Sequence, residues 1–189
     1  LSLLLGLASG EDSVAAWYEL LKQPSLRLRQ ELGGDAEIRR GAWRRLLRQS
    51  GAIIGTDRIL RSLGRLRSEI EADDALEAER RTRDLAALDA LVGSIEAVRS
   101  DLVALRDPAA RSYGGWCSAF ARLLSRWWLA GPDRSRVLQL LEEAGRSDAG
   151  PRISLSDARA ALAESLAATE ELSGSIGDRA IRVLTPMQL

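Results

Sequence analysis

The chain has 189 residues, the size of one domain or two small ones, and 46% of them are hydrophobic, as in ordinary globular proteins. It contains no histidine, a single cysteine (Cys117) and a single lysine (Lys22). These counts exclude Ser–His and Cys–His nucleophile pairs, histidine-containing zinc sites, an intramolecular disulfide and a GxxxxGK[ST] phosphate loop. We therefore expect the chain by itself neither to hydrolyse ATP nor to cut DNA.

The two ends of the chain suggest a segment of a longer protein, because it begins at Leu1 and its one methionine is Met187. The apolar residues 1–8 are too few to span a bilayer and are predicted to be the end of a buried helix. No later stretch is long and apolar enough to span one either, and a free cysteine is typical of a reducing compartment. We expect a cytoplasmic protein without a membrane partner.

The net charge of zero hides a separation of charge along the chain. Residues 22–67 hold twelve basic and four acidic groups, a net +8, whereas residues 68–101 hold four basic and ten acidic groups, a net −6. Such asymmetry indicates either an anionic partner or two segments that lie against each other. Both interpretations remain open at this stage.

Leucine- and alanine-rich composition with few aromatic residues favours an all-α fold. Asp12 is the predicted N-cap of a first helix, which Pro24 ends, and residues 25–37 are predicted to form a loop. A short basic helix then covers residues 38–50, and Gly51 follows it in the usual C′ position.

A long helical hairpin is predicted next, formed by residues 56–74 and 75–106. Thr56 or Asp57 is the expected N-cap of its first helix. In its second helix, apolar residues recur at spacings of three and four, which places them on one face. That face comprises Leu85, Leu88, Leu91, Ile95, Val98, Leu102 and Leu105.

Three further helices are predicted over residues 116–129, 132–144 and 155–169. Ser154 precedes the last of them and stands three residues before Asp157, as in a capping box. Residues 179–186 alternate β-branched and polar side chains and form the one predicted strand.

Five arginines of the predicted 38–50 helix are the main chemical feature: Arg39, Arg40, Arg44, Arg45 and Arg48. Arginine suits bidentate contacts with phosphate and stays charged when partly dehydrated, so the cluster is our candidate DNA-binding site. The alternatives are a solvated helix face and neutralisation by the acidic residues 69–84. Trp43, Leu46 and Leu47 are expected to anchor the opposite side in the core.

Aromatic residues of the predicted 116–129 helix share a face at Trp116, Phe120 and Trp127. They could stack on nucleic-acid bases, but core packing is the favoured interpretation. Cys117 is expected to be a small buried hydrophobe. The adjacent carboxylates Asp73-Asp74 and Glu142-Glu143 diverge on their helices, so no metal or catalytic site is predicted there.

The order of these segments resembles the helicase–nucleases of the AddB/RecB type, which are UvrD-like superfamily 1 proteins that carry a PD-(D/E)xK nuclease. In the first half, the resemblance is carried by the leucine run 3–7, the tract 14–26 and the Trp-containing helix that leads into Gly51-Ala52-Ile53-Ile54-Gly55. In the second half it is carried by residues 116–124, 137–144, 153–157 and 181–187.

The resemblance implies a helical accessory domain, at the 2B position, over residues 1–178, and the start of a strand of an adjacent RecA-like motor domain over residues 179–189. Such a domain is non-catalytic and positions duplex DNA against the motor during double-strand-break repair and recombination. ATP and Mg²⁺ belong to the parent protein, and no catalytic, cofactor or metal residue falls within this chain. The implied partners are DNA, the motor and nuclease domains, and a second helicase–nuclease subunit.

The alternative is a stand-alone helical scaffold or protein-interaction module. In that case the acidic segment 68–101 would meet a basic partner.

Overall fold

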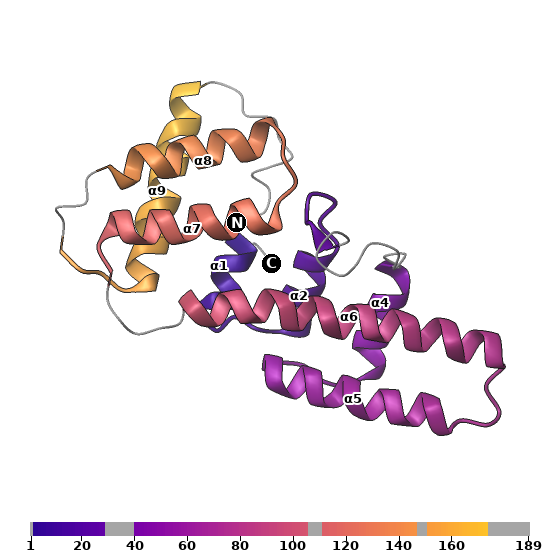
Figure 1. The fold of residues 1–189 in the computed structure, drawn as a ribbon. Helices are drawn as coiled ribbons and strands as arrows, with labels where there is room; N and C mark the ends of the chain where they lie inside the picture. The colour runs from indigo at the N-terminus through magenta and orange to yellow at the C-terminus, as the bar shows by residue number, and fades with distance from the viewer. Residues whose placement is uncertain (1, 29–39, 106–110, 147–150, 174–189) are drawn as a thin grey trace.

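The computed structural model of the chain describes residues 2–28, 40–105, 111–146 and 151–173. Within these residues the chain forms helices and loops without a strand, which confirms the predicted all-α class (Figure 1). The described helices are α1 (Ser2–Ala8), α2 (Val14–Leu21), α4 (Arg40–Gln49), α5 (Thr56–Ala72), α6 (Ala78–Leu105), α7 (Tyr113–Trp127), α8 (Pro132–Gly145) and α9 (Leu155–Ser173).

The long helix α6 runs through the middle of the molecule and connects its two ends (Figure 1). At one end α5 packs antiparallel beside α6, which confirms the predicted hairpin, and α4 packs against both. At the other end α7 packs against α8 and α9. Helices α1 and α2 lie against each other, and α1 also packs against α6.

The apolar stripe of α6 forms the spine of the core. Six of its seven predicted members are buried, and Leu85 is half-buried. Burying a leucine or isoleucine side chain contributes roughly 1.5–3 kcal/mol, so this one stripe supplies much of the stability. The six buried members are Leu88, Leu91, Ile95, Val98, Leu102 and Leu105.

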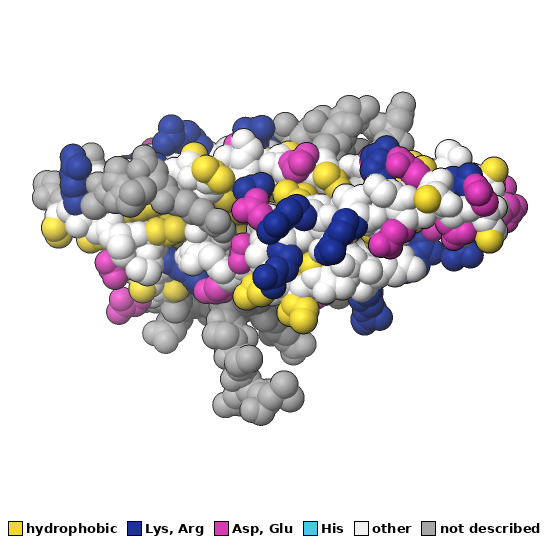
Figure 2. Space-filling model, turned by 90° about the horizontal axis from the view of Figure 1, so that it is seen from below, with side chains coloured by type: hydrophobic (Ala, Val, Ile, Leu, Met, Phe, Trp, Pro, Cys, Tyr) yellow, Lys and Arg dark blue, Asp and Glu magenta, His cyan; other side chains and the backbone are white. Residues whose placement is uncertain are grey.

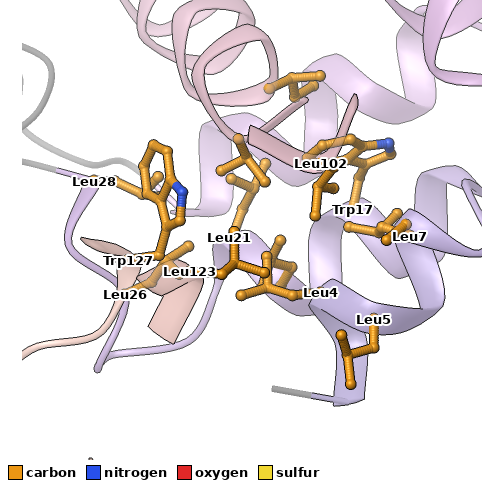
Figure 3. Close-up of a cluster of buried hydrophobic side chains, with 14 of the residues drawn as sticks. Leu4, Leu5, Leu7, Trp17, Leu21, Leu26, Leu28, Leu102, Leu123 and Trp127 are labelled. Atoms are coloured by element: carbon orange, nitrogen blue, oxygen red, sulfur yellow. The ribbon is translucent and has the colours of Figure 1, made fainter. Parts of the chain in front are cut away.

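Helices α1, α2, α6 and α7 meet in one cluster of buried side chains (Figure 3). Leu4 from α1, Trp17 from α2, Leu102 from α6 and Trp127 from α7 are all at most 2% exposed. The buried position of α1 confirms the prediction that the apolar N-terminal residues belong to a buried helix.

Two of the predicted helix starts are wrong. Ser13, not Asp12, is the N-cap of α2, and its hydroxyl accepts a hydrogen bond from the backbone N of Ala16 at 3.1 Å. Gly55, not Thr56 or Asp57, occupies the N-cap position of α5 with a positive φ of 90°. The Asp12 carboxylate instead accepts hydrogen bonds from the backbone N and the hydroxyl of Thr56, at the start of α5.

Helices at the other end differ from the predictions at their boundaries. Helix α7 begins three residues earlier than predicted, because the Ser112 hydroxyl accepts the backbone N of Gly115 at 3.1 Å and caps it. The capping box at α9 is confirmed: the Ser154 hydroxyl accepts the backbone N of Asp157 at 3.2 Å, and the Asp157 carboxylate accepts the backbone N of Ser154 at 3.4 Å. The predicted strand at residues 179–186, and with it the predicted domain boundary after residue 178, lies outside the described residues.

Candidate nucleic-acid interface

Helix α4 is held in the core by three side chains on its inner face. Trp43, Leu46 and Leu47 are each at most 1% exposed, as their spacing predicted. The indole N–H of Trp43 donates to the carbonyl oxygen of Ala87 on α6 at 3.0 Å. These contacts fix the direction in which the opposite face of α4 presents its side chains.

Arg44 and Arg48 project from that opposite face. They are four residues apart and both are exposed. The guanidinium of Arg44 lies 6.0 Å from the ring centroid of Tyr18 on α2, and in the described part of the chain neither arginine makes an ion pair with a carboxylate. Two guanidiniums on a helix anchored in the core can therefore be offered to an anion without first breaking an ion pair in the described part of the chain.

Arg45 points toward α6. Its guanidinium forms an ion pair with Asp84, which is 9% exposed, while Arg80 lies 3.9 Å from the same carboxylate. An almost buried carboxylate is costly unless it is paired, so Arg45 has a structural task. The structure thus separates Arg45 from the outward pair Arg44 and Arg48.

The structure does not describe the side chains of the other two predicted site residues. Arg40 is the first residue of α4, but its side chain lies outside the described ones. Arg39 lies outside the described residues altogether.

A pocket of about 290 Å³ lies between the start of α4 and the start of α6. Its charged side chains are of both signs, and all three of its arginines already pair: Arg45 and Arg80 with Asp84, and Arg83 with Glu79 at 2.9 Å. Because nearby carboxylates neutralise these arginines, the pocket has little positive potential to attract a phosphate group. The pocket is lined by Gly41, Ala42, Arg45, Glu77, Arg80, Arg83 and Asp84.

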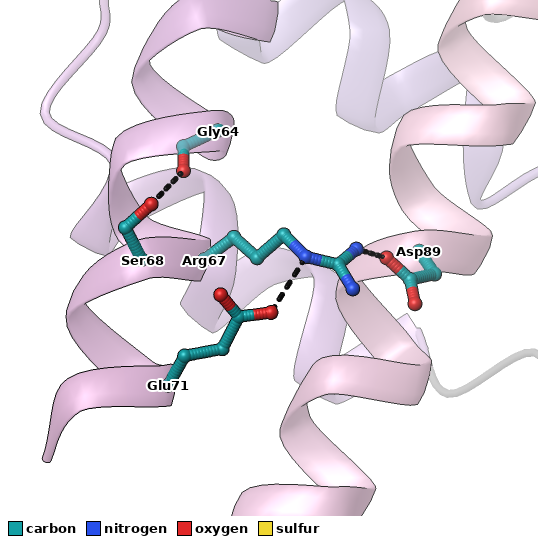
Figure 4. Close-up of polar contacts among 5 residues, drawn as sticks. All are labelled: Gly64, Arg67, Ser68, Glu71 and Asp89. Carbon is teal, nitrogen blue, oxygen red and sulfur yellow. Dashed lines mark hydrogen bonds and ion pairs between the residues drawn. The ribbon is translucent and has the colours of Figure 1, made fainter.

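Further ion pairs join the basic and acidic segments of the sequence. Arg67 of α5 bonds to Glu71 on its own helix at 2.9 Å and also to Asp89 on α6 (Figure 4). The hydrogen bond to Glu71 and the charge of Asp89 raise the pKa of Arg67. Together with Arg45–Asp84, the Arg67–Asp89 contact indicates that the two segments lie against each other over part of their length.

A second set of exposed arginines was missed in the sequence. Arg58, Arg61 and Arg65 stand on the outer face of α5, and Figure 2 shows basic side chains gathered in the middle of the molecule when it is viewed from the α5 side. Their spacing of three and four residues was the available signal.

Aromatic residues on α7 serve the core. Trp116 and Phe120 stack with ring centroids 5.8 Å apart, and both are buried with Trp127. The indole N–H groups of Trp116 and Trp127 donate to the carbonyl oxygen of Ile153 at 3.0 Å and to the carboxylate of Asp101 at 2.6 Å. Stacking on nucleic-acid bases is therefore not available to these rings, and core packing is confirmed.

Cys117 is 1% exposed, as expected of a small buried hydrophobe. Burial raises the pKa of its thiol, and burial likewise raises the pKa of the neighbouring Tyr113 hydroxyl. A thiol that stays protonated and covered is a poor nucleophile.

Within the described ranges, no three acidic or thiol side chains are grouped so that they could bind a metal ion. None of the helices in this part combines the length and the apolar character that crossing a bilayer requires.

Comparison with family models, with curated proteins and with solved structures gives no match for this chain.

Proposed function

We propose that the chain is a non-catalytic, DNA-binding helical domain of a cytoplasmic, ATP-dependent helicase–nuclease that acts in double-strand-break repair and recombination. The domain positions duplex DNA against the motor by contacting its phosphate backbone. The resemblance of its segment order to AddB/RecB-type proteins supports the parent activity. ATP and Mg²⁺ are bound by other domains of the parent, with which this domain and a partner subunit assemble.

The observation that carries the DNA contact is the outward pair Arg44 and Arg48. Both guanidiniums are exposed, neither makes an ion pair with a carboxylate in the described part of the chain, and the helix that bears them is fixed by Trp43. Arginine forms bidentate hydrogen bonds to phosphate. Because its helix is already fixed, binding orders little besides the side chain, and the entropic cost is small. The contact is independent of base sequence, because phosphate contacts carry no sequence information.

The test is a titration of a fluorescent forked duplex with the 189-residue chain at several salt concentrations. Replacement by Arg44→Ala and Arg48→Ala together should weaken binding and flatten the log–log salt slope by about 1.8, at roughly 0.9 per phosphate contact. A charge-matched control, Arg83→Ala with Arg146→Ala, removes two exposed arginines that pair with Glu79 and Glu142 on their own helices.

The control variant should keep the slope of the original chain. If the two double variants behave alike, binding follows net charge and the proposed contact is refuted. An unchanged slope in a folded Arg44→Ala/Arg48→Ala variant would refute it as well.

A second candidate function is a protein-interaction module. It is favoured by the exposed carboxylates around the α5–α6 turn, which include Glu69, Asp73, Asp74 and Glu77 and make no ion pair in the described part of the chain.

A further inference from the structure

The outer face of α5 carries unneutralised positive charge in its N-terminal half. Arg58, Arg61 and Arg65 are exposed, and they lie opposite the face of the helix that packs into the core. Arg61 donates to the carbonyl oxygen of Asp57 at 3.3 Å, and Arg65 donates to the hydroxyl of Ser62 at 3.0 Å. In the described part of the chain, no carboxylate lies within ion-pair distance of these three arginines.

The opposite end of the same hairpin carries unneutralised negative charge. Glu69, Asp73, Asp74 and Glu77 are exposed around the turn from α5 to α6, and the described residues offer them no ion-pair partner. Figure 2 shows acidic side chains at this end, on the right of the view, with basic ones among them. The intervening Arg67 is already bound by Glu71 and Asp89 (Figure 4).

The hairpin therefore has a basic base and an acidic tip: from Arg58 to Asp73 the two charge groups extend over about 22 Å at 1.5 Å per residue, and they meet between Arg65 and Glu69. Two such elements attract each other when they lie antiparallel, since the basic base of each then faces the acidic tip of the other. About a two-fold axis both copies use the same surface, so the contact between a basic base and an acidic tip forms twice.

The middle of the outer face includes two positions with little or no side chain, Gly64 and Ser68, beside the longer Arg65 and Arg67. Gly64 and Ser68 are exposed, and a Cβ atom added at Gly64 would meet nothing within 4 Å. The Ser68 hydroxyl turns back onto its own helix and donates to the carbonyl oxygen of Gly64 at 3.5 Å (Figure 4). A second helix can approach closely at this point.

Two exposed isoleucines add apolar area beside the basic base. Ile53 and Ile54 are 78% and 54% exposed, although their backbone is held by a bridge between Ser13 and Ile54 and by a hydrogen bond from the backbone N of Val14 to the carbonyl oxygen of Ile53 at 2.9 Å. In an antiparallel pair they would lie near the partner copy's α5–α6 turn, where Leu76 is half-buried. This apolar contact is needed because exposed ion pairs alone contribute little to the free energy of association.

We propose that the outer face of α5 is a docking surface for a second copy of this chain, which binds antiparallel about a two-fold axis near Gly64 and Ser68. This assignment goes beyond the proposed DNA contact and uses none of the α4 arginines. Nucleic acid fits the face less well than a second copy, because the carboxylates that continue along the hairpin would repel a phosphate backbone.

The first experiment measures sedimentation velocity of the 189-residue chain over a range of protein concentrations, at low and at high salt. We expect a monomer–dimer equilibrium that shifts toward monomer as salt rises, because the contacts are largely ionic. A chain that stays monomeric at low salt at every concentration overturns the proposal.

The second experiment reverses the charges at each end separately. One variant carries Arg58→Glu, Arg61→Glu and Arg65→Glu, and the other carries Glu69→Arg, Asp73→Arg and Asp74→Arg. Each variant alone should lose the dimer, whereas an equimolar mixture should form a heterodimer in which every reversed contact is attractive again. Circular dichroism checks that both variants are folded.

Failure of the mixture to associate overturns the antiparallel pairing, even if each variant is monomeric. So does loss of forked-duplex binding in the triple Arg→Glu variant at concentrations where the original chain is monomeric, since the face would then belong to nucleic acid. The Arg44→Ala/Arg48→Ala variant should still dimerise, so failure of the DNA proposal and failure of the docking proposal are distinguishable.

Discussion

The carboxylate of Asp12 accepts two hydrogen bonds from Thr56, one from its backbone N at 2.9 Å and one from its hydroxyl at 3.1 Å. Asp12 thereby caps helix α5 from a distant part of the chain, because Gly55 at the N-cap position has no side chain to do so. The Thr56 hydroxyl also accepts the indole N–H of the buried Trp17 at 3.1 Å. One carboxylate thus joins α2 to the base of the hairpin.

Replacing Asp12 by alanine should lower the free energy of unfolding by about 1–2 kcal/mol, because the first turn of α5 loses this side-chain cap and Thr56 is almost fully buried. Asp12→Asn keeps an acceptor oxygen and should lose less. Urea unfolding of both variants measures the effect, with Glu96→Ala on the exposed side of α6 as a control. Equal midpoints for Asp12→Ala and the control would contradict the capping role.

Removal of Arg45 should destabilise the fold more than removal of an exposed arginine. Arg45→Ala leaves Asp84 almost buried without its main partner, and we expect a loss of about 1–2 kcal/mol. Arg83→Ala breaks only an exposed pair on one helix and should cost less than about 0.5 kcal/mol. Adding Asp84→Asn to Arg45→Ala should recover part of the loss in a double-mutant cycle.

Thermal unfolding of the four proteins of that cycle supplies the coupling energy between the two side chains. A coupling energy of zero would show that the Asp84 carboxylate does not need Arg45 to be stable in the folded protein.

Truncation of Trp43 should be the most damaging change in α4. Its side chain is 1% exposed, so Trp43→Ala should cost about 3–5 kcal/mol. Trp43→Phe retains most of the buried area but loses the hydrogen bond to Ala87, which should cost about 1–2 kcal/mol. Chemical unfolding measures both, and a phenylalanine variant as unstable as the alanine variant would show that the ring volume is not what holds α4.

Stability should decline at alkaline pH. Burial raises the pKa of the Cys117 thiol above its ordinary value of 9.0 and that of the Tyr113 hydroxyl above 10.0. Because the folded state favours the neutral forms, this stability is fully present below the unfolded pKa values and is lost as pH rises through the folded ones. Urea midpoints measured from about pH 7 to pH 10.5 should fall above about pH 9.

The matched variant is Cys117→Ala, which should be less stable at every pH but show a shallower alkaline decline. An identical decline in the variant and the original chain would show that ionisation of the Cys117 thiol does not cause the alkaline loss of stability.

Local pattern alone was enough to predict the helices and their inner faces. Apolar residues at spacings of three and four identified the stripe of α6 from Leu88 to Leu105, and Trp43 marked the inner side of α4. The burial of a helix face depends on which residues share one side of it, and this is a property of sequence spacing. Ser154 and Asp157 were predictable for the same reason, since a capping box is closed within four residues.

Contacts between distant segments were decided only by the tertiary structure. The predicted arginine cluster divides because α4 crosses α6 at Asp84, which binds Arg45 and leaves Arg44 and Arg48 outward. Asp12 had an equally good local role as an N-cap, but Thr56 is brought to it from another helix. Spacing along one helix gives the side of the helix on which a charge lies, whereas its partner depends on how the helices pack together.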